Sequence, residues 1–140
     1  MVKFLLRRSR LSLMAACCGL LLLSACATLP PEEAVAERAT ARWNTLLSDD
    51  LVGAYEFLSP GYRSSVSSNQ YQRSVLLNRV RWTGAQVNES ECTETSCKVK
   101  ISLDYAVYGA VPGVQSFEST QTVVESWVRV DGKWYYVPNK

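Results

Sequence analysis

Two acidic residues are the best candidates for chemistry in this chain of 140 residues, which contains no histidine. Asp104 is followed by Tyr105, and Glu125 lies about twenty residues later. In a pocket, a carboxylate beside an aromatic side chain could take a proton from the carbon next to a carbonyl group. In the alternative, both carboxylates face solvent and form surface ion pairs with Lys100 or Arg129, which need no function. We favour the ion pairs, so the sequence predicts no catalytic residue.

Aromatic side chains are numerous, with four tryptophans and seven tyrosines. They could line a pocket for a flat or acyl ligand, or they could simply form the core, which is the favoured alternative. The candidate pocket residues, aromatic and acidic together, are Trp43, Tyr55, Trp82, Asp104, Tyr105, Glu125, Trp127 and Trp134. No phosphate-binding, zinc-protease or nucleophile-elbow motif occurs, and neither a metal nor a cofactor is predicted.

Most of these residues lie in the second half of the chain, where the pattern is typical of antiparallel strands. Strands are expected at 80–91, from Cys97 to about Val107, at 117–130 and at 133–137. The second strand alternates clearly, which predicts one buried face. Gly84 suggests a bulge in the first, and Asp131-Gly132 is a strong hairpin signal. The residues of this buried face are Cys97, Val99, Ile101, Leu103, Tyr105 and Val107.

Helices are predicted in the first half of the domain. Pro31 is suited to open a helix, and apolar residues at helical spacing predict that one face is buried. Arg38 and Arg42 are expected on the other side of this helix. A second helix is expected at 51–58, then a serine-rich loop at 62–68 and a third helix that ends near Leu77. The apolar face of the first helix consists of Val35, Ala39, Trp43, Leu46 and Leu47.

The first 26 residues carry the most specific motif. Four basic residues precede an apolar run at 11–23, and Leu23-Ser24-Ala25-Cys26 follows. This segment resembles a bacterial lipoprotein signal peptide. The resemblance implies cleavage of residues 1–25, a lipid on Cys26 and a short lipidated tether at 26–31. The alternative is an uncleaved transmembrane anchor, but the run falls short of the ~20 residues that a spanning helix needs.

The same resemblance implies a location. Ala27, rather than aspartate, follows the cysteine, which in a diderm host indicates the outer membrane, with the domain on the periplasmic side. Acylation would attach the protein to the membrane stably. All four basic residues before residue 26 would be lost, so the formal net charge would change from +2 to −2. No basic block would remain, and nucleic acid is therefore not an expected partner.

After processing, Cys92 and Cys97 would be the only cysteines besides Cys26. In an oxidising compartment two thiols most simply form a disulfide, here at the end of a hairpin between the first two strands. A metal site and a redox pair are the alternatives. The C-x4-C spacing and the lack of histidine argue against both.

The order of helices and strands resembles the NTF2-like (SnoaL-like) family. The segments Ala54–Arg63 and Glu125–Tyr135 carry this resemblance, the first as A-Y-x-x-L-S-P-x-Y-R and the second as its closing W-x-x-x-D-G-x-W hairpin. It implies an α+β cone at residues 32–140, with amino-terminal helices packed on a curved antiparallel sheet and a pocket at the open end. Some members of the family are enzymes and others bind ligands or partners, so fold alone does not decide function.

Together these features predict a lipid-anchored, non-catalytic domain of the cell envelope. We expect it to bind a partner protein or a small apolar ligand. Two alternatives remain: an isomerase or dehydratase that uses Asp104 or Glu125 as its base, and a structural subunit of an envelope complex. The sequence leaves the oligomeric state open.

Overall fold

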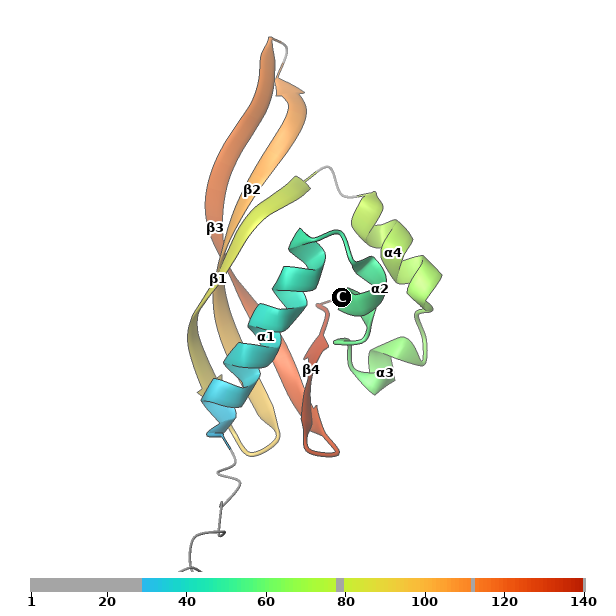
Figure 1. Ribbon diagram of the computed structural model, residues 1–140, viewed down its shortest axis with the longest axis vertical. Coiled ribbons are helices and arrows are strands. Elements are labelled where there is room, and N and C mark those ends of the chain that lie inside the picture. Colours follow the sequence, from blue (N-terminus) through green and yellow to red (C-terminus); the bar gives the residue numbers. More distant parts are fainter. Residues whose placement is uncertain (1–28, 78–79, 112, 140) are drawn as a thin grey trace, which may run out of the picture.

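The computed structural model describes residues 29–77, 80–111 and 113–139. It confirms an α+β fold in which helices precede a curved antiparallel sheet, and Figure 1 shows the helices gathered on one side of that sheet. The helices are α1 (Pro31–Leu47), α2 (Leu51–Tyr55), α3 (Pro60–Arg63) and α4 (Ser68–Leu76). The strands are β1 (Val80–Cys92), β2 (Ser96–Val111), β3 (Val114–Val130) and β4 (Lys133–Val137).

The predicted signal peptide and the lipidation site at Cys26 lie outside the described residues. Within the described ranges, no helix has both the length and the apolar character needed to cross a membrane.

Helix α1 supplies much of the core. Pro31 opens it, where its missing N–H is not needed, and the predicted apolar positions from Val35 to Leu46 are buried. One prediction for this helix is wrong: Arg42 is buried with 5% of its surface exposed, rather than facing solvent. Arg42 shares the stripe of Val35, Ala39 and Leu46, so the helix turns its guanidinium into the domain.

Three short helices follow α1, and a side chain caps the amino terminus of each. Asp50 caps α2 by accepting from the Gly53 amide at 2.8 Å, and Ser67 caps α4 in a capping box with Gln70. The serine-rich loop predicted at 62–68 instead begins inside the short helix α3, which ends at Arg63. Ser59 accepts from the Tyr62 amide, and Pro60 occupies the first turn, which together explain this helix.

The sheet is a meander in the order β1-β2-β3-β4. The predicted bulge at Gly84 is present, and a second irregularity follows Val87. The predicted alternation of β2 is confirmed from Cys97 to Leu103, and all four of its inward side chains are buried. Among the described residues, only β2 and β3 remain paired beyond Val107, and these two strands extend past the helices (Figure 1).

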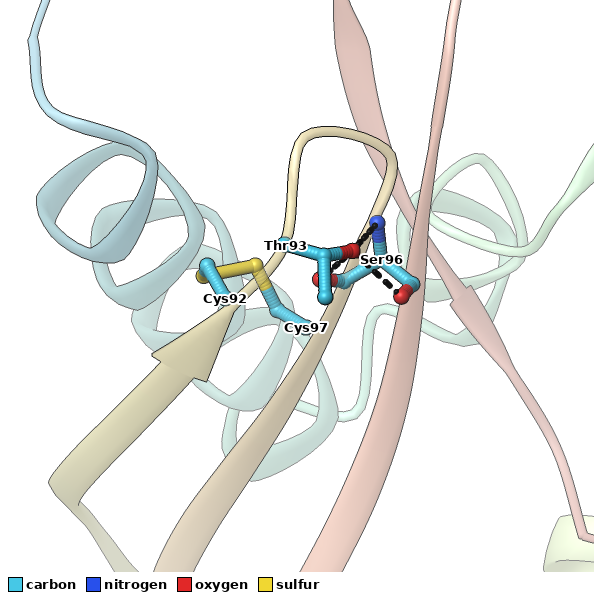
Figure 2. Close-up of a disulfide and its surroundings, with 4 residues drawn as sticks. All are labelled: Cys92, Thr93, Ser96 and Cys97. Carbon is cyan, nitrogen blue, oxygen red and sulfur yellow. Dashed lines mark hydrogen bonds between the residues drawn. A yellow bond between two sulfur atoms is a disulfide. The ribbon is translucent and has the colours of Figure 1, made fainter.

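The predicted disulfide closes the β1–β2 hairpin. Cys92 and Cys97 are partners in the strand register and are bonded through their sulfur atoms, as Figure 2 shows. Inside the loop, the Thr93 amide donates to the Ser96 carbonyl oxygen at 2.7 Å, and the Ser96 amide donates to the Thr93 hydroxyl at 3.1 Å. The bridge therefore fixes the register where the two strands begin to pair.

Strand β4 brings the end of the chain back to the helices. The Ser59 amide donates to the Tyr136 carbonyl oxygen, and the Tyr136 amide donates to the Phe57 carbonyl oxygen, both at 2.8 Å. The turn before β4 is the predicted Asp131-Gly132 hairpin, in which both residues have positive φ. This closure places the Tyr136 ring next to the guanidinium of Arg42, 3.9 Å from its centroid.

Candidate functional site

Glu125 lies inside the domain, with 4% of its surface exposed. Its Oε1 accepts hydrogen bonds from Arg42 Nη1 at 2.7 Å and from Trp43 Nε1 at 3.1 Å, and its Oε2 accepts from Trp127 Nε1 at 3.0 Å. The expectation that Glu125 faces solvent and pairs with Arg129 is therefore wrong. Glu125 shares a face of β3 with the fully buried Trp127, and this face is turned toward the helices.

Burial sets the electrostatics of this carboxylate. Loss of solvation raises the pKa of Glu125 above its usual value, whereas the charge of Arg42 and the two indole hydrogen bonds act in the opposite direction. Arg42 in turn lies against the rings of Tyr136 and Trp43, at 3.9 and 5.1 Å from their centroids. The pair is thus an internal ion pair held between aromatic rings.

A cavity of about 360 Å³ opens beside this pair, between α1, α4 and the inner face of the sheet. Its apolar wall includes Trp43 and Trp82, whose rings meet edge to face at 5.3 Å. Its volume is at the lower end of the range for small-molecule sites. The polar or aromatic residues of its lining are Arg42, Trp43, Tyr62, Tyr71, Ser74, Trp82, Gln121, Glu125, Tyr136 and Asn139.

Burial changes the pKa of two tyrosines that line the cavity. Loss of solvation raises the pKa of both Tyr71 and Tyr136, although the charge of Arg42 lowers it in each case. Both hydroxyls are therefore protonated at neutral pH. Tyr71 is buried with 5% of its surface exposed, and its hydroxyl lies beside the guanidinium of Arg42.

Three of the sequence candidates, Trp43, Trp82 and Glu125, line this cavity. The others lie elsewhere. Tyr55 packs against the core and donates its hydroxyl proton to the Val66 carbonyl oxygen at 2.8 Å, while Trp127 and Trp134 are core residues. The candidates that the structure does not bring to the cavity are Tyr55, Asp104, Tyr105, Trp127 and Trp134.

Asp104 faces solvent, as expected, but it does not pair with Lys100. It accepts from the Thr120 hydroxyl at 2.6 Å, whereas Lys100 pairs with Glu89 at 2.7 Å. Asp104 also lies close to Gly84, where an added Cβ would come within 2.7 Å of its carboxylate. Asp104 is therefore an exposed residue of the outer sheet surface and is separate from the cavity.

Among the charged and aromatic residues of the cavity, the sequence interpretation missed four: Arg42, Tyr62, Tyr71 and Tyr136. A signal for Arg42 was available, because positions 35, 39, 42 and 46 follow the helical spacing of a buried stripe. Tyr71 and Tyr136 depend on contacts between distant segments, which sequence spacing does not reveal. Within the described part of the chain, no cluster of histidine, cysteine or acidic side chains is placed to hold a metal ion.

Comparisons of sequence found no matching family model and no matching curated protein. Solved structures do match. A SEC-C motif containing protein from Rhodopseudomonas palustris has 13% identity and a TM-score of 0.57, with 74% of each chain covered. A protein from Streptomyces avermitilis, described as a dehydratase of the NTF2-like family, has 12% identity and a TM-score of 0.53, covering 77% of this chain and 96% of the other.

A third match is a protein from Campylobacter jejuni that is described as an NTF2-like transpeptidase. It has 14% identity and a TM-score of 0.51, covering 74% of this chain and 96% of the other. At such identities the likeness concerns the fold alone. The helices followed by a curved antiparallel sheet thus form an α+β fold with NTF2-like structural neighbours.

Proposed function

We propose that this protein binds a small molecule in the cavity beside Arg42 and Glu125, without transforming it, as a lipid-anchored protein of the cell envelope. The supporting observation is the state of Glu125, which is the only acidic residue among the described residues that line the cavity. Its carboxylate accepts hydrogen bonds from three donors. A general base must reach the proton that it removes. Here Oε1 already accepts two hydrogen bonds and Oε2 accepts one, so Glu125 serves as the counter-ion of Arg42.

A second candidate function, catalysis with Glu125 as general base, has two observations in its favour. Glu125 lines the cavity, and burial raises its pKa. Raised carboxyl pKa values are one way in which enzymes prepare an acid or base. One structural neighbour is also described as a dehydratase. Catalysis requires the carboxylate of Glu125 as a base, whereas binding without catalysis does not.

Complementation of a deletion strain by Glu125→Gln separates the two functions. For a binding protein, we expect this variant to restore the phenotype once its abundance matches wild type, because the amide oxygen can still accept from Arg42 and Trp43. Its NH₂ group would face the Trp127 indole N–H, and the buried Arg42 guanidinium would lose its counter-ion, so a loss of stability of about 3–5 kcal/mol is expected. Abundance should therefore be checked by blot. Removing a general base lowers a rate on the order of 10²–10⁴-fold.

Asp104→Asn is the matched control, because it removes a carboxylate that lies outside the cavity and is exposed. It should restore the phenotype fully. Failure of Glu125→Gln at normal abundance, with Asp104→Asn active, would refute the binding function and support the enzyme.

The membrane location rests on the motif Leu23-Ser24-Ala25-Cys26. Cys26→Ala should leave an unprocessed precursor, because the lipid acceptor and the cleavage site are both lost. Mass spectrometry of the membrane fraction measures the cleavage and the added acyl mass. Normal maturation of Cys26→Ala, with unchanged mass and membrane attachment, would rule out the lipoprotein assignment.

A further inference from the structure

One edge of the sheet is open along most of β3. Strand β4 pairs with β3 only from Ser126 to Val130, while β2 lies along the other side of β3. Strand β4 then turns to the helices, where Tyr136 bridges Leu58, and the chain end lies beside α2 (Figure 1). Within the described ranges, residues 114–124 therefore pair with β2 alone, and we call this stretch the open edge.

The backbone of the open edge presents hydrogen-bonding groups to its unpaired side. In an antiparallel strand, the N–H and C=O groups of successive residues point to alternate sides. The Arg129 amide donates to the carbonyl oxygen of Thr95, which immediately precedes β2, whereas the pair Val130–Lys133 closes the hairpin to β4 on the other side. Even-numbered residues of β3 therefore direct these groups away from β2. In the open edge, the exposed residues of this kind are Ser116, Glu118, Thr120, Thr122 and Val124.

The sequence of the open edge lacks the features that usually protect a sheet edge. Proteins block edge pairing with lysine, proline, bulges or a covering element. The opposite edge, β1, has two register irregularities and lies against α1. The open edge contains no lysine, arginine or proline, and its register with β2 is regular from Ser116 to Val124. Phe117 adds an exposed apolar ring to it. Such an edge is a template for pairing with another strand.

We propose that a second copy of this chain occupies the open edge, with the two β3 strands antiparallel about a twofold axis at Ser119. This register pairs residues 114–124 with the same residues of the second copy, and it ends before β4 begins to pair. Glu118 is the only charged residue of the stretch, and it would lie opposite Thr120 of the second copy. No like charges would therefore face each other directly across the two strands.

A second copy fits this edge better than an extended segment of another protein. One foreign strand would leave its own outer edge unpaired, whereas twofold pairing covers both open edges at once and gives a closed dimer. Phe117 would lie opposite Gln121 and diagonal to Val123 of the second copy, within reach of an aromatic side chain. Gln121 and Val123 also line the cavity, so the second copy would lie beside it. This pairing requires no ligand and is independent of the proposed function.

Antiparallel pairing also constrains how a lipid-anchored dimer would lie. Helix α1 begins at one end of the sheet, and β2 and β3 extend past the helices at the other end (Figure 1). The amino termini of the two α1 helices would therefore lie at opposite ends of the joined sheet. Both can reach one membrane when the sheet lies along the membrane surface and the twofold axis is normal to it.

Cysteine cross-linking tests the proposed axis in the membrane. Ser119 would face Ser119 of the second copy in a non-hydrogen-bonded pair, whose Cα atoms lie about 4.5 Å apart, within the range of a disulfide. After copper-catalysed air oxidation of membranes that contain the full-length protein, Ser119→Cys should give a dimer on non-reducing gels. Thr122→Cys is the matched control, because its two thiols would lie about 20 Å apart. This control and wild type should remain monomeric on the gel.

Charged substitutions test the register without cysteine. Ser116 would lie opposite Thr122 of the second copy, whereas within one chain these two exposed residues lie about 20 Å apart. Ser116→Glu/Thr122→Glu places like charges in both cross-strand pairs, and Ser116→Lys/Thr122→Glu places opposite charges there. Sedimentation of the detergent-solubilised, full-length protein gives the dissociation constant of the dimer. This constant should be higher for the first double variant by roughly tenfold or more.

The inference is overturned if Ser119→Cys cross-links no more than Thr122→Cys, or if the two double variants have equal dissociation constants. A cross-linked product that contains a different protein would also overturn it, because the edge would then take a foreign partner rather than a second copy. Both double variants change only exposed positions, so they should fold alike and keep the comparison valid.

Discussion

Arg42→Met should lower the free energy of unfolding by about 3–5 kcal/mol at neutral pH, because it leaves the buried Glu125 carboxylate without its counter-ion. Methionine resembles the arginine stem in length, so the lost charge rather than a new cavity dominates the effect. Denaturant unfolding, checked for two-state behaviour, provides the measurement. Arg38→Met is the matched control: Arg38 lies on the same helix, contacts the Phe57 ring at 4.2 Å and forms no ion pair within the described residues.

The loss of stability caused by Arg42→Met should become smaller as the pH falls. Without Arg42, which lowers the pKa of Glu125, the folded-state pKa of this carboxyl rises further above its unfolded value. A group with a raised folded pKa stabilises the fold below its unfolded pKa, and this contribution is lost as the pH rises through the folded pKa. The variant should therefore regain stability as the pH falls. Equal losses in Arg42→Met and Arg38→Met at neutral pH would show that the ion pair contributes little.

Trp127→Ala should lower the free energy of unfolding by about 3–5 kcal/mol, since Trp127 is fully buried and among the largest side chains of the core. The variant also removes one of the three donors to Glu125. Trp127→Phe fills most of the same space without the indole N–H, so it separates packing from hydrogen bonding. Unfolding curves for both variants are the measurement. A loss below ~1 kcal/mol in Trp127→Ala would contradict the placement of this side chain at the centre of the core.

Much of the fold follows from local patterns in the sequence. The apolar stripe of α1, the alternation in β2, the bulge at Gly84 and the turn at Asp131-Gly132 each have one physical cause that acts within a few residues. The cap at Ser67 likewise depends on residues that lie close together in the sequence. These elements in turn require a sheet with helices on one face.

The polar interior could not be predicted in the same way. A charged residue on a strand is normally taken as solvent-facing, and Glu125 is buried only because three donors from two elements meet it. Its neighbour Trp127 indicated the buried face of β3, and Arg42 occupied a stripe position on α1. Each signal was visible, but their pairing depends on how α1 crosses the sheet. The short helix α3 was missed because its cap and its proline resemble those of a turn.

The protonation of Glu125 tests the central claim most directly. A ¹³C NMR titration of its side-chain carboxyl, assigned by comparison with Glu125→Gln, distinguishes a counter-ion from a general acid or base. We predict that Glu125 is ionised at pH 7 and that it titrates only in the acidic range, with a pKa above the usual glutamate value because of burial. A carboxyl that is protonated at pH 7, or that titrates near neutrality, would contradict this account and identify Glu125 as a group prepared for proton transfer.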